Sequence, residues 1–252
     1  SLLPPIQPDK YVVFQPTNTG TGNRILAMVS AYALSLVTGR SFLIDWRTTE
    51  VFKANLSSLF ITNIPSLSSV IPKNYSWSDD QYHFLNLVYC RQCAVRIRHS
   101  TFAQLATENL TKIFNRKFIF VRSNVYFAPD FIANPYHREV LCSVFEPKNL
   151  FHSLYKKLFK LAPEIEKELN AILGPISSRD LIGIQIRVKD RVAFPIKKAS
   201  SFFSCANYIS SSYNNPLFFI ASDSEDLKKW GKLFLNDVLE LNKPTHNFSQ
   251  EG

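Results

Sequence analysis

The sequence of 252 residues lacks the features that mark membrane-spanning and nucleic-acid-binding chains. No apolar run reaches the roughly 18 to 20 residues that a membrane-spanning helix needs, and residues 1–8 contain three prolines but no apolar signal core. Lysine and arginine are scattered in runs no longer than two, whereas nucleic-acid binding favours a basic stripe. We therefore expect a chain that is soluble as given and binds no nucleic acid. Its start at Ser1 leaves open a membrane anchor or signal removed from upstream.

Cysteine is also scarce, and the spacing of the four cysteines argues against a zinc site. Cys90 and Cys93 form one C-x-x-C pair, but no second pair and no nearby histidine completes a zinc-finger spacing. Because both lie in an apolar, aromatic stretch, 85–95, we interpret them as buried thiols or a local disulfide. No metal site is predicted.

The chain does contain enough apolar residues for a globular core, with 46% hydrophobic and 13% aromatic residues. A chain of this length can bury one large core or two small ones. The formal net charge, 29 − 20 = +9, favours a partner that carries negative charge, such as the phosphates of a nucleotide.

The first 45 residues have the pattern of a βαβ unit. A short apolar run, 11–14, is followed by a loop with two glycines and by a helical apolar pattern over 23–38, which Gly39 closes as a left-handed cap. A second strand over 40–45 ends in Asp45. The amino end of the helix can hold an anion against its backbone N–H groups, although the same glycines also suit a tight turn before a core helix.

A second strand–loop–helix pattern lies in the last third of the chain. Residues 181–190 have the pattern of a parallel strand that is buried on both faces. Arg187 lies at its carboxyl end, where open α/β sheets bind ligands. The alternative is an ordinary salt-bridged arginine. Another apolar strand, 216–221, leads into an acidic helix, 225–235, with Ser222 or Asp223 as its N-cap. This second occurrence of the strand–loop–helix order predicts an α/β fold with two Rossmann-like halves.

The remaining elements follow from periodicity and from proline and glycine positions. We expect helices over 51–60, 101–114, 150–161, 163–173 and 201–212, and a strand over 117–121.

Three stretches together resemble the fucosyltransferase-like superfamily, which includes protein O-fucosyltransferases, core α-1,6-fucosyltransferases and plant xyloglucan fucosyltransferases. They are Gly22-Asn-Arg-Ile25 with Leu43-Ile-Asp-Trp46, then Ile184-Gln-Ile-Arg-Val-Lys-Asp190, then Phe218-Phe-Ile-Ala-Ser-Asp-Ser-Glu225. The resemblance covers the start and the last third of the chain. It implies a GT-B fold, with two Rossmann-like domains facing a cleft: 1–149 on the acceptor side and 150–252 binding the nucleotide sugar.

The resemblance also implies inverting, metal-independent transfer of a sugar to a glycan hydroxyl, without a cofactor. Arg187 would hold the donor phosphates, which agrees with the need of a metal-free enzyme for a cation at the departing nucleotide. Asn23 would lie at the reaction centre. The other donor-binding candidates are Gly22, Arg24, Gln185, Ser222, Asp223 and Ser224. A Golgi or secretory compartment is implied, with the cytoplasm left open.

The donor is less sharply defined than the chemistry. The resemblance makes GDP-fucose the first expectation for the donor. Many relatives have histidine where this chain has Gln185, which weakens the inference of a guanine nucleotide, so a UDP-sugar such as UDP-xylose is the second expectation. The chain is also short at its carboxyl end compared with those relatives, which continue with another strand and a serine-rich segment. A binding module that kept the fold without catalysis is a third reading.

An inverting displacement also needs a base for the acceptor hydroxyl. Asp45 is our candidate because it ends a strand beside the glycine-containing loop. The competing readings are a structural cap or salt bridge at Asp45, or a base role for Glu50 or Asp190.

Overall fold

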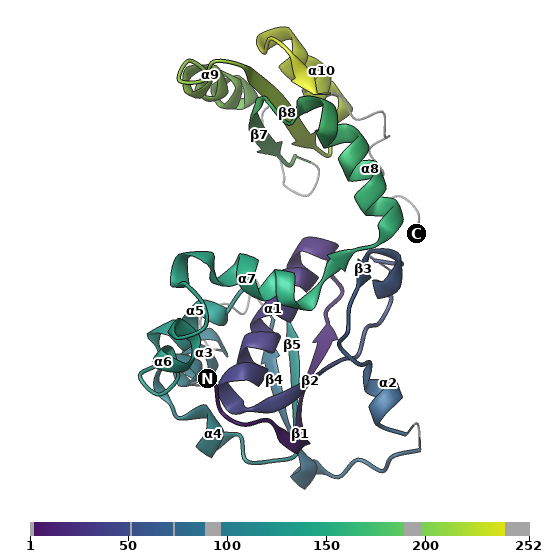
Figure 1. Cartoon of the computed structure of the whole chain (residues 1–252), viewed down its shortest axis with the longest axis vertical. Coiled ribbons are helices and arrows are strands. Elements are labelled where there is room, and N and C mark those ends of the chain that lie inside the picture. Colours follow the sequence, from purple (N-terminus) through teal and green to yellow (C-terminus); the bar gives the residue numbers. More distant parts are fainter. Residues whose placement is uncertain (1–2, 51, 73, 89–96, 189–197, 240–252) are drawn as a thin grey trace. The chain divides into compact units, whose positions relative to one another are not determined.

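The computed structural model describes residues 3–50, 52–72, 74–88, 97–188 and 198–239 (Figure 1). The chain divides into two compact units, Ser1–Ile165 and Glu166–Gly252. Each unit is built around a parallel sheet, which confirms the predicted α/β class.

The sheet of the first unit has the strand order β2-β1-β5-β4, and all neighbours are parallel. Its strands are β1 (Gln7–Pro16), β2 (Arg40–Ile44), β4 (Tyr82–Leu87) and β5 (Phe118–Ser123). Parallel pairing brings the carboxyl ends of all four strands to one edge of the sheet. Gln15, near the end of β1, and Asp45, directly after β2, therefore lie at the same edge.

Helix α1 (Thr21–Thr38) connects β1 to β2 and confirms the predicted βαβ unit. Gly39 ends it with φ 62° and ψ 37°, and its N–H donates to Leu36 O. A side chain is strained in this left-handed conformation, and a Cβ here would also lie 2.7 Å from the carbonyl oxygen of Pro5. Glycine is thus required at this turn.

The first unit also contains the helices α3 (Ile97–Thr107), α4 (Leu110–Ile113), α5 (Ala128–Ala133), α6 (Arg138–Cys142) and α7 (Leu150–Leu158). Of these, α4 to α7 pack against α1, and α3 packs against α5 and β4. Figure 1 shows α7 against α1, and both contribute to one apolar core with the sheet. The short elements are η1 (Leu56–Ser58), β3 (Phe60–Ile61), α2 (Leu67–Val70), η2 (Asp79–Gln81), η3 (Pro147–Asn149) and β6 (Lys160–Leu161). β3 and β6 pair antiparallel.

The opposite face of this sheet has a thinner cover. Val13, Leu43, Phe118 and Phe120 form a second buried cluster, and side chains between residues 67 and 82 pack on it. Among the described residues, the helix that contributes to this cover is the short α2 (Leu67–Val70). This difference between the two faces leaves room for the pocket described below.

The second unit begins in helix α8 (Pro163–Leu173), which starts at the end of the first unit, and continues through η4 (Gly174–Ile176). Its sheet has the order β7-β8-β9 with parallel pairing, from β7 (Asp180–Ile186), β8 (Pro216–Ser222) and β9 (Val238–Leu239). Helices α9 (Ala199–Ser210) and α10 (Glu225–Phe234) pack against it.

Several local predictions are wrong. The described part of 51–60 contains η1 and the start of β3 instead of a helix. The predicted helix 101–114 is broken at Asn109, whose side chain caps α4, and the helix predicted over 150–161 ends at Leu158. β7 is not buried on both faces, because Ile184 and Ile186 are buried while Gln185 and Arg187 are exposed.

Two further differences concern the second half of the chain. The N-cap of α10 is Ser224, whose side chain accepts from Leu227 N, rather than Ser222 or Asp223. The compact units also divide after Ile165, beyond the boundary expected at 149/150, because α7 packs its Leu150 and Leu154 into the core of the first unit. Among the described residues, none of the helices is both long enough and apolar enough to cross a membrane.

Candidate functional site

A pocket of about 320 Å³ lies where β7 and β8 end in the second unit. It is lined by Gln185, Ile186, Arg187, Ala221, Ser222 and Asp223. The two strands are parallel and in register, with Gln185 beside Ala221 and Ile186 beside Ser222, so their carboxyl ends open at the same place. Four of the predicted donor-binding residues are therefore brought together: Gln185, Arg187, Ser222 and Asp223.

Hydrogen bonds within the chain fix the acidic side of this pocket. Asp223 Oδ1 accepts from Val188 N at 2.8 Å, which ties the loop after β8 to the loop after β7. Ser222 Oγ accepts from Ser224 N at 3.1 Å. Ser224 does not line the pocket, and its hydroxyl caps α10. Asp223 thus shapes the site, while the exposed Arg187 places a cation in it.

The amino end of α1 in the first unit contains Gly22 and Asn23, and both are exposed. Gly20 is the N-cap, and as a glycine it has no side chain that could cap the helix. The first N–H groups of a helix of this length carry partial positive charge, so this end suits an anion. A Cβ at Gly22 would meet nothing within 4 Å, so the fold itself does not require glycine there.

Arg24 follows in the same turn but points into the protein. Its side chain is fully buried, and the guanidinium donates to Thr19 O, Arg47 O and Thr49 Oγ1 at 2.7–2.9 Å. It also lies 5.0 Å from the ring centre of Trp46. Burial lowers the pKa of Arg24 from its ordinary value. A donor contact for Arg24, as predicted, would require the guanidinium to leave these three partners.

Asp45 lies at the edge of the first sheet and makes the salt bridge that the sequence left as an alternative. Its Oδ2 accepts from Gln15 Nε2 at 2.9 Å and from Arg47 Nε and Nη2 at 3.1 and 2.6 Å. Within the described residues, its other oxygen, Oδ1, has no such hydrogen bond.

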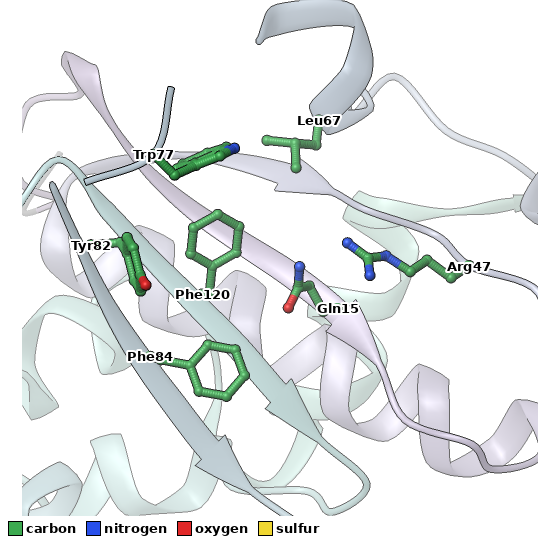
Figure 2. A pocket seen from close by; sticks show the side chains of 7 residues that line it. All are labelled: Gln15, Arg47, Leu67, Trp77, Tyr82, Phe84 and Phe120. Atoms are coloured by element: carbon green, nitrogen blue, oxygen red, sulfur yellow. The ribbon is translucent and has the colours of Figure 1, made fainter. Parts of the chain in front are cut away.

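Beside Asp45, sequence reasoning missed a pocket of about 300 Å³ on the thinly covered face of the first sheet (Figure 2). Its lining residues are Gln15, Arg47, Leu67, Trp77, Tyr82, Phe84 and Phe120. The rings of Tyr82, Phe84 and Phe120 stand on neighbouring strands, and Trp77 lies over Phe120. The alternation of aromatic residues at 82 and 84 and at 118 and 120 was the available signal, but it does not reveal which face stays open.

Comparison with known proteins shows what this chain is similar to. A family model described as xyloglucan fucosyltransferase matches residues 7–97. Among curated proteins, the Arabidopsis thaliana probable fucosyltransferase 9 is 26% identical over 207 residues, covering 71% of this chain and 42% of that protein. Fucosyltransferase 6 of the same plant is 26% identical over 213 residues, covering 73% of this chain and 38% of that protein. The chain is thus similar to plant fucosyltransferases in sequence.

Solved fucosyltransferase structures share its fold. A variant of Arabidopsis thaliana FUT1 in complex with GDP superposes with a TM-score of 0.66 at 20% identity, covering 89% of this chain and 56% of that one. NodZ α-1,6-fucosyltransferase soaked with GDP-fucose gives a TM-score of 0.57 at 17% identity, covering 94% and 79%. The chain thus has an α/β fold with two parallel sheets that is similar to the fold of GT-B fucosyltransferases. The chain spans about two fifths of the length of the curated relatives it matches.

The matched part of the fucosyltransferase family model, residues 7–97, includes α1, Asp45 and β4 and ends before β7. The aromatic pocket draws most of its lining from this part, whereas Arg187 lies outside it. In the described ranges, no group of three or more histidine, cysteine or acidic residues could hold a metal ion, and Cys142 and Cys205 are free and exposed. Cys90, Cys93 and Asp190 lie outside the described residues.

Proposed function

We propose that this chain transfers L-fucose from GDP-fucose to a hydroxyl of a glycan, with inversion at the sugar carbon and without a metal ion. The observation that carries the proposal is the pocket at the carboxyl ends of β7 and β8, which contains Arg187. Ligands of parallel α/β sheets bind at such strand ends. The similarity to fucosyltransferases supports the reaction class, and FUT1 and NodZ, which share the fold, were solved with GDP or GDP-fucose.

The roles of the pocket residues follow from the charge that develops when the nucleotide leaves. The bond between the fucose C1 and the diphosphate oxygen breaks, and both electrons stay with the diphosphate. Arg187 offers a planar pair of N–H donors to that oxygen and its neighbours, which stabilises the departing charge. Ser222 supplies a hydroxyl beside it, and Asp223 holds the loop through Val188 N. We also propose that Asn23 lies at the reaction centre, as the resemblance to fucosyltransferases implies.

The acceptor hydroxyl forms its new bond to C1 from the opposite face and loses its proton as it does so. We propose Asp45 as the group that takes this proton, on Oδ1, since Oδ2 is held by Gln15 and Arg47. A carboxylate in hydrogen-bond reach of the hydroxyl is sufficient for this step. No metal ion is needed if Arg187 supplies the positive charge.

A nucleotide panel tests the donor. Thermal unfolding is recorded with GDP, UDP and ADP, because a ligand at about 100 times its Kd stabilises the folded chain by about 2.7 kcal/mol. We expect GDP to give the largest shift. A larger shift with UDP would favour a UDP-sugar donor, to which Gln185 in the pocket could be suited.

Release of the nucleotide tests the reaction. GDP should be released from GDP-fucose when a glycan acceptor is added, and the rate should not change with EDTA. Nucleotide binding without any release would favour a binding module. Loss of release with EDTA, restored by manganese or magnesium, would contradict the metal-free mechanism.

A further inference from the structure

The aromatic pocket beside Asp45 has one rigid wall. The Trp77 ring centre lies 5.0 Å from that of Phe118 and 5.2 Å from that of Phe120, both in edge-on contact. Tyr75 packs against the same indole at 4.8 Å. These neighbours fix the orientation of Trp77, yet 41% of its surface stays exposed. Trp77 therefore presents a pre-positioned flat face to the pocket.

Phe84 forms another part of the wall and has fewer neighbours. It is 49% exposed, and among the described residues it makes no ring contact. Exposed single apolar residues are common at protein surfaces. Here, however, two large exposed rings line one cavity of about 300 Å³, at the lower end of the size of small-molecule sites. The cavity has room for a ligand of one ring.

The other end of the pocket is polar. Gln15 donates its Nε2 to Asp45 Oδ2, so its amide oxygen points elsewhere and can accept a hydrogen bond. Arg47 uses Nε and Nη2 on the same carboxylate oxygen, and within the described residues its Nη1 makes no hydrogen bond. Figure 2 shows the amide and the guanidinium side by side, next to the rings. One acceptor and one charged donor thus border an aromatic wall.

This combination fits the chemistry of a sugar ring. A pyranose has a face of C–H groups, which packs on aromatic rings, and an edge of hydroxyls, each of which can donate and accept hydrogen bonds. A diphosphate would call for more cations than Arg47. A purely apolar ligand would give no partner to the Gln15 amide oxygen or to Arg47 Nη1, the two atoms that the contacts with Asp45 leave over.

We propose that this pocket binds one sugar ring of the acceptor glycan, stacked on Trp77 and Phe84, with hydroxyls hydrogen-bonded to Gln15 and Arg47; this assignment rests on the proposed function. Asp45 is held at the polar end of the pocket by the same two residues. A hydroxyl of the bound ring, or of the residue joined to it, comes within reach of that carboxylate. The pocket thereby selects which hydroxyl reacts.

Direct saccharide binding tests the pocket without any donor. Saturation-transfer NMR is recorded for the wild-type chain with lactose, cellotetraose and chitotetraose. We expect at least one of them to bind, with the strongest transfer to the C–H protons of one ring. Phe84→Ala and Trp77→Leu should weaken this binding about tenfold or more. Tyr136→Ala is the matched control, because Tyr136 is 58% exposed on the same unit and lies outside the pocket.

Phe84→Ala guards against a loss of binding that is caused by unfolding. The Phe84 ring has no ring neighbours among the described residues, so its removal leaves the contacts of Trp77 with Phe118 and Phe120 intact. GDP affinity should stay unchanged in both variants. If GDP binds and no saccharide does, or if the variants bind saccharide as tightly as wild type, the pocket assignment is wrong while the proposed function stands. If saccharide binds at the pocket but GDP does not, the donor assignment fails instead. A dimer in light scattering that Phe84→Ala dissociates would show that protein covers the pocket, and would overturn the proposal.

Discussion

Replacement of Arg24 by lysine tests how the first unit holds the segment after β2. The guanidinium donates from Nε to Thr19 O at 2.9 Å, from Nη1 to Arg47 O at 2.8 Å and from Nη2 to Thr49 Oγ1 at 2.7 Å. Lysine has the charge but not the planar fork, so one ammonium group cannot reach all three acceptors. We expect Arg24→Lys to be strongly destabilised.

The magnitude follows from the bonds that are lost. A hydrogen bond to a charged group contributes roughly 1.5–3 kcal/mol, and the lysine loses two of three. The sum is reduced because contacts within one network are not additive, which leaves about 3–4 kcal/mol. The guanidinium also lies 5.0 and 4.8 Å from the ring centres of Trp46 and Phe52, contacts that an ammonium keeps only in part. Such a loss is a large fraction of a typical stability of about 5–15 kcal/mol.

The assay is urea unfolding followed by tryptophan fluorescence. The control is Arg138→Lys, because Arg138 is an exposed arginine of the same unit, and its replacement should change the free energy of unfolding by no more than about 0.5 kcal/mol. If Arg24→Lys unfolds at the wild-type urea concentration, these hydrogen bonds do not hold the segment and our interpretation is refuted. Nucleotide affinity, measured on the folded variant, separates a donor contact of Arg24 from this positioning role.

Three further predictions concern the reaction and the pH dependence of stability. Arg187→Lys should lower turnover about a hundredfold without loss of stability, and near-full turnover would contradict the phosphate role. Asp45→Asn should bind GDP normally and lose at most about 1 kcal/mol with its ion pair, yet transfer about a hundred to ten thousand times more slowly; unchanged turnover would remove Asp45 from the mechanism. Burial lowers the pKa of His137, whose Nε2 accepts from Leu110 N at 3.0 Å. Below about pH 6.5 the unfolded chain therefore binds a proton that the folded chain does not, and stability should fall on acidification. His137→Gln should flatten the measured dependence between pH 7.5 and 5, and an equal slope in both proteins would argue against His137 as its source.

The parts of the fold that the sequence predicts well are those in which local pattern and tertiary burial agree. The run Tyr11–Phe14, the helix closed by Gly39 and the strand that follows it form a unit whose apolar residues are buried, the helix in the main core and the two strands in a cluster on each face of the sheet. β8 and α10 were predicted for the same reason. The N-cap of α10 was displaced to Ser224 because Ser222 and Asp223 bind backbone N–H groups at the strand end instead.

The wrong helix over 51–60 has a different cause. The apolar residue Phe52, 9% exposed, meets Trp46 edge to face at 5.8 Å, and both rings lie against the guanidinium of Arg24. Phe52 thus packs on a buried cation, while Leu56, Leu59 and Phe60 pack against the main core of the unit. A periodicity count cannot detect this, since the partner is more than 20 positions away and is polar.

The placement of Arg187 and Ser222 at one pocket could be predicted from two strand assignments, because parallel strands have their carboxyl ends at the same edge of a sheet. Their role in binding the donor stays a prediction. The aromatic pocket could not be found in this way. Its residues come from β1, the segment after β2, α2, the chain before β4, β4 itself and β5. Which of these side chains stays exposed depends on how sparsely residues 67–82 cover the sheet.

The hydrogen bonds of the first unit connect its buried arginine to its candidate base. Arg24 holds the carbonyl of Arg47, and the side chain of Arg47 holds Asp45 Oδ2. Gln15 fixes the same oxygen from β1. A change at Arg24 therefore reaches Asp45 and the polar end of the aromatic pocket through one residue, whereas the Arg187 pocket belongs to the other unit. If the two pockets hold acceptor and donor, changes in the first set should raise the acceptor KM and slow transfer at unaltered GDP affinity, and changes at Arg187 should do the reverse.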